Sequence, residues 1–336
     1  MIRIGIIGAG NNATEHARYY HECDRTRVIA VADPVTERAR ALADLCGAKW
    51  VGDYRQMLGE VDAVVVASPN QFHKEQMLTC ARAGRHVYCE KPVGLCGADA
   101  RAMADAAAAA DVRSAVGFSV RNSPAIRTLA RLVERGDLGR LTSIWSRRLM
   151  ALPADHLKGW RADPRVSGGL LLEINIHEID WMMMLGGSVR EVYARTACTR
   201  TAGERANDHL WVTLSFADGA VGLHEGSWAS ALPNFFRGAH GDAGGAQTDE
   251  WGQHLRFAAM GQNMVPVDLD PPFDLRAAFL DAIETGQACA CDLAWGAAVM
   301  GVADAIFASA AEGRPVRLPA IAVRPLSPSP RAAGVA

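Results

Sequence analysis

The stretch IRIGIIGAGNNA, residues 2–13, contains the turn that decides the fold. Its first six residues are apolar enough to predict a buried β-strand, and the strand runs directly into a Gly-x-Gly-x-x-Ala turn. Gly8 permits a tight turn, Gly10 lets the backbone approach a pyrophosphate, and Ala13 lets the following helix pack closely on the sheet. Asn11 and Asn12 open that helix, whose N-terminus would face the phosphates. The pattern predicts a dinucleotide site.

The next strand supports this interpretation. It ends at Asp33, twenty residues beyond Ala13, where an acidic side chain binds the adenosine ribose hydroxyls. A carboxylate there repels the 2′-phosphate of NADP, so NAD is favoured as the cofactor. Arg38, one helical turn further on, could bind that 2′-phosphate, so NADP stays the alternative cofactor. In the alternative interpretation, the glycines only serve packing in a doubly wound fold that binds something else.

Strands and helices alternate over residues 1–121. The pattern favours strands at 3–7, 28–32, 63–67, 86–89 and 114–118, and helices at 14–23, 34–46, 71–83 and 98–110. This order requires crossover connections and a parallel sheet with helices on both faces. We therefore expect an α/β protein whose NAD-binding Rossmann domain, a doubly wound parallel sheet, spans residues 1–121.

The pattern changes after residue 121. We expect a helix at 124–134, a strand at 141–146, an irregular stretch at 153–169, and one apolar helix at 170–185. Strands at 189–197, 209–216 and 220–228 follow. These elements predict a substrate-binding and oligomerisation domain of α+β type over residues 122–324, with a large open, mostly antiparallel sheet. Residues 232–253 predict a long loop over a site or a subunit contact, and residues 325–336 a disordered tail.

Composition narrows the class of partner. The 35 Lys and Arg residues are nearly matched by 37 Asp and Glu residues, for a net charge of −2, so nucleic acid and anionic membranes are not expected partners. No uninterrupted apolar run reaches about 18 residues, and Met1 opens a strand rather than a secretory signal. The eight cysteines have no Cys-x-x-Cys spacing, which predicts reduced thiols and no metal site. We expect a cytoplasmic protein with a small-molecule partner.

Two groups of residues could carry chemistry. Oxidation of an alcohol by NAD needs a base for the hydroxyl proton and a cation near the oxygen. Lys91 follows the strand at 86–89 and so belongs at the carboxyl edge of the sheet, although a lysine there is often just a solvated loop residue. Glu173, His177 and Asp180 share one face of the apolar helix. In the alternative interpretation, no cleft lies beside that face, and His177 is a buried core histidine paired with a carboxylate.

Six motifs in this order resemble the Gfo/Idh/MocA family of dehydrogenases. They are the glycine turn, Ser68-Pro-Asn70-x-x-His73, Glu90-Lys91-Pro92, Gly117-Phe-Ser-Val-Arg121, Trp160-Arg161, and the helix with Glu173, His177 and Asp180. The resemblance extends from residue 2 to about residue 318. It implies a substrate held between a Rossmann domain and an open-sheet domain whose broad sheet forms homodimers or homotetramers.

The resemblance also implies residue roles. His177 would be the general base, Lys91 would bind the substrate oxygen, and Glu173 would orient one of them. The cofactor would also contact Ser68, Asn70, His73, Glu90 and Lys91, and the substrate would contact Arg121, Trp160, Arg161, Asn175 and Asp180. Two positions depart from the family: Glu173 replaces an aspartate, and Asn175 replaces a small residue. The longer Glu173 implies either a substrate further from the helix or a carboxylate folded back on Lys91.

The sequence leaves several substrate classes open. The string His-Glu-Ile-Asp is similar to inositol-dehydrogenase-like members, which implies a sugar, a cyclitol or another polyhydroxylated ring. Acidic residues could instead suit an amino sugar or an aminoglycoside, unless they simply form a solvated surface. These are Glu173, Glu178, Asp180, Asp242, Asp249 and Glu250. Two further hypotheses are an NAD-dependent glycoside hydrolase and a non-catalytic NAD(H)-binding regulator.

Overall fold

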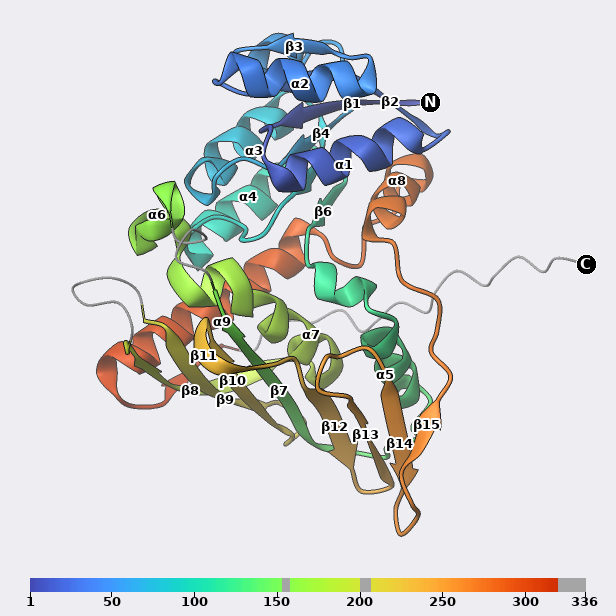
Figure 1. The fold of residues 1–336 in the computed structure, drawn as a ribbon, viewed down its shortest axis with the longest axis vertical. Helices are drawn as coiled ribbons and strands as arrows, with labels where there is room; N and C mark the ends of the chain where they lie inside the picture. The colour runs from blue at the N-terminus through green and yellow to red at the C-terminus, as the bar shows by residue number, and fades with distance from the viewer. Residues whose placement is uncertain (153–157, 200–206, 320–336) are drawn as a thin grey trace, which may run out of the picture.

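The computed structural model describes residues 1–152, 158–199 and 207–319, and it has two sheets (Figure 1). A parallel sheet with helices on both sides forms the upper half of Figure 1, and a broad sheet forms the lower half. The helices α5, α7 and α9 lie between the broad sheet and the upper half. The predicted tail at 325–336 and part of the stretch at 153–169 lie outside the described residues.

The upper sheet confirms the predicted Rossmann fold. Its six strands are all parallel, in the order β3-β2-β1-β4-β5-β6. The strands are β1 (Ile2–Ile7), β2 (Thr26–Ala32), β3 (Lys49–Val51), β4 (Ala63–Val66), β5 (His86–Cys89) and β6 (Ser114–Val116). The helices are α1 (Asn11–Glu22), α2 (Thr36–Cys46), α3 (His73–Arg82) and α4 (Gly97–Ala109), with short turns at Tyr54–Met57 and Asn70–Phe72.

This strand order determines where a ligand can lie. The chain leaves β1 in one direction toward β2 and returns on the other side to β4, so the order reverses beside β1. A crevice opens at the carboxyl ends of the strands at such a reversal. The four residues of β4 are fully buried, as strands covered on both faces are. The short edge strand β3 was not predicted, because its three residues are partly exposed and show no apolar run.

The broad sheet is mixed but mostly antiparallel, as predicted. Within the described residues its order is β15-β14-β13-β12-β7-β10-β9-β8-β16, with β11 also paired to β7, and only β7 and β10 are parallel neighbours. The strands are β7 (Leu141–Ala151), β8 (Val189–Ala197), β9 (His209–Phe216), β10 (Val221–Ser227), β11 (Ala229–Asn234), β12 (Arg237–Gly241), β13 (Gly244–Thr248), β14 (Leu255–Ala259), β15 (Val265–Val267) and β16 (Val316–Arg317).

The prediction of a long loop at 232–253 was wrong. This stretch contains the end of β11 and all of β12 and β13, which extend the sheet beyond β7. Its glycines look like loop residues in the sequence, yet they serve packing, since a Cβ atom at Gly238 would overlap the ring of Trp145 on the neighbouring strand. The strand β7 also continues to Ala151, five residues past its predicted end at Ser146.

The remaining helices connect the two sheets. They are α5 (Pro124–Glu134), α7 (Ile176–Gly186), α8 (Leu275–Thr285) and α9 (Leu293–Glu312). Short helical segments lie at Ser119–Asn122, Gly159–Ala162, α6 (Pro164–Ser167) and Leu171–Asn175. By length and composition α9 could cross a membrane, but most of it is buried against α4 and β8, which identifies it as a core helix.

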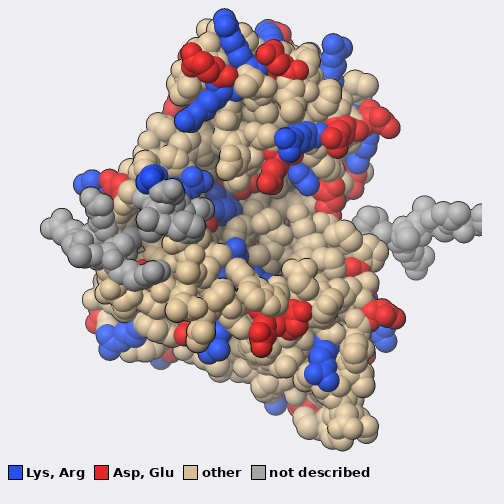
Figure 2. All heavy atoms as spheres, in the orientation of Figure 1, with Lys and Arg blue, Asp and Glu red and all other residues tan. Residues whose placement is uncertain are grey.

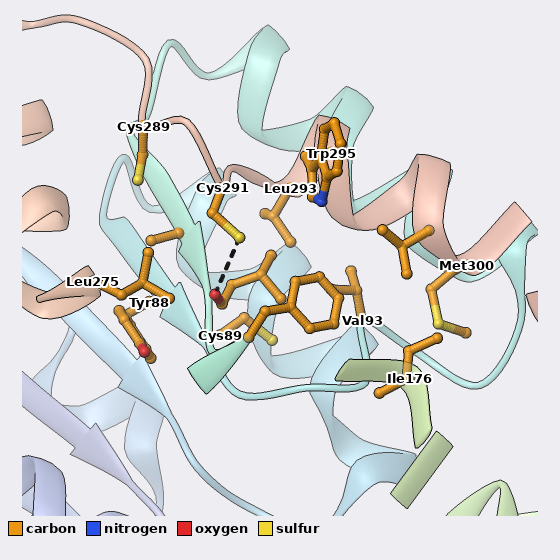
Figure 3. Packing of buried hydrophobic residues seen from close by; sticks show 14 of the residues in the cluster. Tyr88, Cys89, Val93, Ile176, Leu275, Cys289, Cys291, Leu293, Trp295 and Met300 are labelled. Atoms are coloured by element: carbon orange, nitrogen blue, oxygen red, sulfur yellow. Dashed lines mark hydrogen bonds between the residues drawn. The ribbon is translucent and has the colours of Figure 1, made fainter. Parts of the chain in front are cut away.

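The C-terminal part of the chain packs back against the Rossmann domain. Figure 1 shows α8 beside β6, and the ring of Phe279 on α8 lies 5.9 Å from that of Tyr88 on β5. Further along the chain, the thiol of Cys291 donates to the main-chain oxygen of Val116, at the start of a cluster that continues into α9 (Figure 3). The two domains therefore share one continuous apolar core.

A buried ion pair lies within this shared core. The guanidinium of Arg121 donates to both carboxylate oxygens of Asp180 on α7, at 2.7 and 2.8 Å, and Trp295 on α9 donates to Asp180 at 2.6 Å. The Arg121 guanidinium also stacks over the Trp295 ring, 4.7 Å from its centroid. Asp180 is fully buried, so its charge depends on these partners.

Replacing Arg121 with Met should lower the free energy of unfolding by about 3 to 5 kcal/mol, because it leaves the Asp180 charge buried and unpaired. Urea denaturation followed by circular dichroism measures the change. Arg140→Met is the matched control, since the Arg140 and Asp242 side chains are exposed and their charged atoms approach no closer than 3.8 Å. Its effect should stay within about 0.5 kcal/mol. Equal losses in both variants would contradict this role for Arg121.

Candidate active site

A cavity of about 740 Å³ opens over the carboxyl ends of β1, β2, β4 and β5. It is lined by most of the residues predicted to bind a cofactor, namely Gly8, Gly10, Asn11, Asn12, Asp33, Ser68, Asn70, His73, Glu90 and Lys91. Ala13 lies behind it, fully buried against the sheet. Arg38, Tyr54, Phe72 and Gln76 also line the cavity, and no motif had indicated the last three.

The glycine turn has the shape that a dinucleotide needs. Gly8 has a φ of +100°, and a Cβ atom there would overlap the Ala67 carbonyl, so only glycine fits. At Gly10 nothing lies within 4 Å of an added Cβ, which leaves open space for a close-lying group. No side chain caps the N-terminus of α1, so its first amide groups remain available to an anion. These residues fit a pyrophosphate.

Asp33 lies at the far end of this cavity. Its carboxylate oxygens accept hydrogen bonds from the main-chain amides of Ala9 and Val35, both at 2.8 Å. Each oxygen still has a lone pair, so the carboxylate can also accept bonds from two ribose hydroxyls. The two amide bonds hold Asp33 in the orientation that this contact requires.

A second cavity, of about 390 Å³, adjoins the first. Asn12, Glu90, Lys91, Arg161 and Glu173 line both cavities. The second cavity is also lined by His177 and by residues without a predicted role, including Glu15, His16, Ser119, Asn122, Arg148, Met150, Leu152 and Arg276. Lys91 and Glu173 thus lie where the two cavities meet, and His177 lies with them on the wall of the second cavity.

Lys91 is held across the domain boundary. Its ammonium group donates to the main-chain oxygen of Glu173 at 2.7 Å. Burial lowers the pKa of Lys91 below its ordinary value, and the nearby carboxylates of Glu173 and Glu90 only partly oppose this. A lysine in such a setting can release a proton more readily than one in water.

Glu173 uses its side chain elsewhere. One carboxylate oxygen accepts from the Asn70 amide at 2.5 Å, and the other accepts from Arg161 Nε at 3.0 Å. The carboxylate therefore does not fold back on Lys91, so that one of the two predictions made from its extra methylene was wrong. The longer side chain reaches across to Asn70 on the Rossmann side, while its main-chain oxygen holds the lysine.

The helical segment that carries Glu173 and His177 is not a regular α-helix throughout. Residues Leu171–Asn175 form a π-helical turn, and the α-helix proper begins at Ile176. Such turns are frequent at functional sites. The i, i+7 spacing had predicted that Glu173 and Asp180 share one face of the helix beside a cleft, but only Glu173 lines a cavity. Asp180 is instead paired with Arg121 in the core.

His177 lies on the wall of the smaller cavity, with its ring packed edge-on against Phe118. Its Nδ1 atom is buried and has no hydrogen-bond partner. Burial lowers the pKa of His177 well below its usual value, and the charges of Lys91 and Arg148 lower it further. The ring is therefore neutral near pH 7 and can accept a proton.

Glu90 and His73 have supporting contacts. Burial alone would raise the pKa of Glu90, but the hydrogen bond with His16, at 2.9 Å, and the charges of His16 and Lys91 outweigh it and lower the pKa. The two ring nitrogens of His73 lie 2.8 Å from the Ser68 carbonyl and 2.9 Å from the Pro92 carbonyl. His73 thus ties together the two loops that flank the cavity.

The predicted substrate contacts divide into two groups. Trp160 and Arg161 line the larger cavity, with the guanidinium of Arg161 stacked 4.6 Å from the Trp160 ring. Arg121, Asn175 and Asp180 line neither cavity, and all three are buried. We therefore revise the prediction for these three residues: Arg121 and Asp180 form the core ion pair, and Asn175 packs beside Gly226 of the sheet.

The acidic residues that suggested a cationic substrate are engaged elsewhere. Glu178 is fully buried and accepts hydrogen bonds from Ser146, Trp181, Arg148 and Arg237. Asp242, Asp249 and Glu250 line neither cavity. Among these residues only Glu173 reaches the site.

Arg148 and Arg276 are the main site residues that the sequence did not reveal. Arg148 lies in the part of β7 beyond its predicted end, so continuing the strand alternation could have placed it on the inner face. Arg276 comes from α8, far along the chain, and no local pattern indicated that α8 returns to the Rossmann domain. Within the described residues no cluster of His, Cys, Asp and Glu could hold a metal ion, and the eight cysteines form no disulfide.

Comparison with known proteins identifies the family of both domains. Residues 2–118 match the family model described as oxidoreductase family, NAD-binding Rossmann fold, and residues 126–247 match the GFO/IDH/MocA C-terminal domain. The myo-inositol 2-dehydrogenase of Thermotoga maritima is 33% identical over 67% of this chain and 68% of its own length. The 1,5-anhydro-D-fructose reductase of Ensifer adhaerens is 30% identical over 90% of this chain and 96% of its own.

The fold also matches a solved structure. A levoglucosan dehydrogenase in complex with NADH and L-sorbose superposes with a TM-score of 0.86 over 96% of this chain and all of that chain, at 24% identity. The likeness shows that both domains, and not only the Rossmann half, have the arrangement of this fold. The matched family is NAD-binding, so NAD is the cofactor, and the cavity lined by the glycine turn and Asp33 has the shape to hold it.

Asp33→Ser should weaken NAD binding about tenfold, because it removes the carboxylate that accepts the ribose hydroxyls. It should also strengthen NADP binding relative to NAD, since the repulsion of the 2′-phosphate disappears beside Arg38. Tryptophan fluorescence titration with each reduced cofactor measures both affinities. Asp44→Ser, a change on the exposed face of α2, is the control and should alter neither. An unchanged ratio of NAD to NADP affinity in Asp33→Ser would contradict this assignment.

Proposed function

This chain belongs to the Gfo/Idh/MocA family of NAD-binding oxidoreductases, and we propose that it oxidises a secondary hydroxyl of a sugar or cyclitol ring to a ketone, or reduces the ketone. The observation that carries the proposal is the junction of the two cavities. There Lys91, Glu173 and His177 line a polar pocket of about 390 Å³ beside the cofactor cleft. A pocket of this size suits a small ring substrate.

The proposed division of labour follows from the contacts. Bound NAD supplies the hydride acceptor. Lys91 binds the reacting oxygen, because its buried ammonium group lies at the junction and has a lowered pKa. His177 is neutral and takes the hydroxyl proton, directly or through Lys91.

Glu173 is a positioning residue in this scheme. Its main-chain oxygen holds the Lys91 ammonium, and its carboxylate bonds to Asn70 and Arg161. It therefore links a loop of the Rossmann domain to the helix that carries His177. The distance between lysine and histidine depends on this link.

A sugar or cyclitol is favoured over an amino sugar or an aminoglycoside. The two relatives are named for an inositol and for an anhydro-sugar ketone, both of which are polyhydroxylated rings. Of the acidic residues that had suggested a cationic substrate, only Glu173 lines the pocket, and Arg161 already bonds to it. The aminoglycoside hypothesis is therefore not part of this proposal.

The proposal predicts NADH formation when the protein is mixed with NAD⁺ and one class of ring polyol. A panel of inositols, aldoses, anhydro sugars, sugar acids and amino sugars, followed by NADH absorbance, identifies that class. Lys91→Ala should lower kcat/KM by at least about a thousandfold, as expected for a group that stabilises charge in the transition state, and should leave NADH affinity within about threefold.

Tight NADH binding with no turnover across the panel would contradict a dehydrogenase. Release of a sugar from a glycoside without net NADH would then identify the NAD-dependent hydrolase. Lys74→Ala is the control variant, since Lys74 pairs with Asp99 and lines neither cavity. It should retain full activity.

We further propose that the outer face of the broad sheet joins subunits into a homodimer or homotetramer. Trp145, Tyr193, Trp211, Leu223 and Phe236 line a shallow depression of about 450 Å³ there. Trp211 and Leu223 are 42% and 48% exposed, and apolar patches of this kind mark contact surfaces. Light scattering should show an oligomer, and Trp211→Glu combined with Leu223→Glu should dissociate it; a monomeric wild type would contradict the proposal.

We propose that the protein is cytoplasmic. Eight cysteines without a disulfide suit a reducing compartment. Recovery of the native protein from a membrane or extracellular fraction would contradict this location.

A further inference from the structure

The smaller cavity has an excess of positive charge on its wall. Its basic residues are Lys91, Arg148, Arg161 and Arg276, and its acidic residues are Glu15, Glu90 and Glu173. Glu15 is exposed to solvent, where its charge is screened. Figure 2 shows Lys and Arg atoms inside the hollow between the two domains. The inner part of the pocket therefore has more cations than anions.

Arg148 is the cation of this set that is compensated least, because Arg161 pairs with Glu173, Lys91 lies beside Glu90, and Arg276 faces Asp274 outside the pocket at 3.8 Å. The carboxylate nearest to it is Glu178, which Arg148 Nη1 contacts at 3.2 Å. That carboxylate already accepts two bonds from Arg237, at 2.6 and 2.8 Å, with further bonds from Ser146 and Trp181. One carboxylate compensates one guanidinium, and Arg237 makes the shorter, bidentate contact. The positive charge of Arg148 thus has no partner of its own.

The hydrogen bonds of Arg148 are also incomplete. Its Nε atom is buried without a partner, and its side chain is 19% exposed on the wall of the cavity. A guanidinium offers five N–H donors. The residues that follow Arg148 and line the pocket, Met150 and Leu152, have apolar side chains that cannot accept these bonds. The cavity is therefore the place where an acceptor could reach the guanidinium.

The acidic residues of the pocket cannot fill this role. Glu90 is paired with His16 and lies beside Lys91, and Glu173 bonds to Asn70 and Arg161. The charge of Arg148 instead lowers the pKa of Lys91 and of His177, in addition to the effect of burial. An anion that enters the pocket would offset the positive charge that Arg148 and Lys91 place beside each other.

We propose that the ring substrate bears a carboxylate, as in a sugar acid, and that Arg148 binds it. The inference rests on the proposed dehydrogenase function and names its substrate class. A singly charged carboxylate matches the guanidinium of Arg148, which has only a share of the Glu178 carboxylate that Arg237 already binds. Met150 and Leu152 would pack against the apolar side of the ring. Arg148 thereby selects acidic over neutral sugars.

The test compares sugars that differ only in this group, such as galactose with galacturonate and glucose with glucuronate. With NAD present, kcat/KM for the acidic member should exceed that of the neutral member by about 30-fold or more, the size of one charged hydrogen-bonded contact. Arg148→Met should lower the ratio of kcat/KM for the acid to kcat/KM for the neutral sugar by about 30-fold, because any change in the pKa of Lys91 or His177 affects both sugars alike. Calorimetry of the acid binding to the NADH complex should show the same loss without turnover.

The control is Arg147→Met. Arg147 is the neighbouring residue on β7, but it pairs with Glu225 and lines the depression on the outer face of the sheet. It should leave both substrates unaffected. If Arg148→Met does not fold, Arg148→Lys, which keeps the charge, takes its place. In addition, the preference of the wild type for the acid should fall as ionic strength rises from about 0.05 M to about 0.5 M.

The outcomes separate the two proposals. Turnover of neutral sugars with no preference for their acids, or with a preference that Arg148→Met leaves intact, would overturn the carboxylate inference and keep the dehydrogenase. A preference for sugar phosphates would overturn it as well. Turnover of no sugar of either kind, with NADH binding intact, would overturn the dehydrogenase itself.

Discussion

The hydrogen bond from the Lys91 ammonium to the main-chain oxygen of Glu173 is the contact on which the rest of the site depends. Its length is 2.7 Å, and it joins the loop after β5 of the Rossmann domain to the π-helical turn before α7. Asn70, in the turn that follows β4, makes a second link to the same π-helical turn, through the Glu173 carboxylate. The shared apolar core sets the two domains side by side, and these bonds hold the lysine and the helix that carries His177 beside the cofactor cleft.

Much of this arrangement could be predicted from the sequence because it follows from local rules. The glycine turn, the apolar strands and the position of Asp33 required a Rossmann fold, and Lys91 follows a strand whose carboxyl end must face the cleft. The helix with Glu173 and His177 also follows from its apolar pattern. In each of these cases a short segment determines both its own structure and its place beside the cofactor.

The remaining features depend on contacts between distant segments. Asp180 has the right spacing to join the site, yet Arg121 and Trp295 hold it in the core. Glu178, its near neighbour, turns to the sheet and to Arg237. The strands β12 and β13 contain glycines that are typical of a loop. Gly238 of β12 is required instead by the Trp145 ring on the neighbouring strand. Each partner comes from another part of the chain, so periodicity could not identify it.

The most direct test of the central claim is a crystal structure of the protein with NADH and the ring compound that the enzyme turns over. The account predicts that the oxygen of the reacting carbon lies within about 3 Å of Lys91 Nζ, with a ring nitrogen of His177 at hydrogen-bond distance from the same oxygen or from the lysine. A reacting oxygen held by other side chains, with Lys91 and His177 turned away from it, would contradict the account.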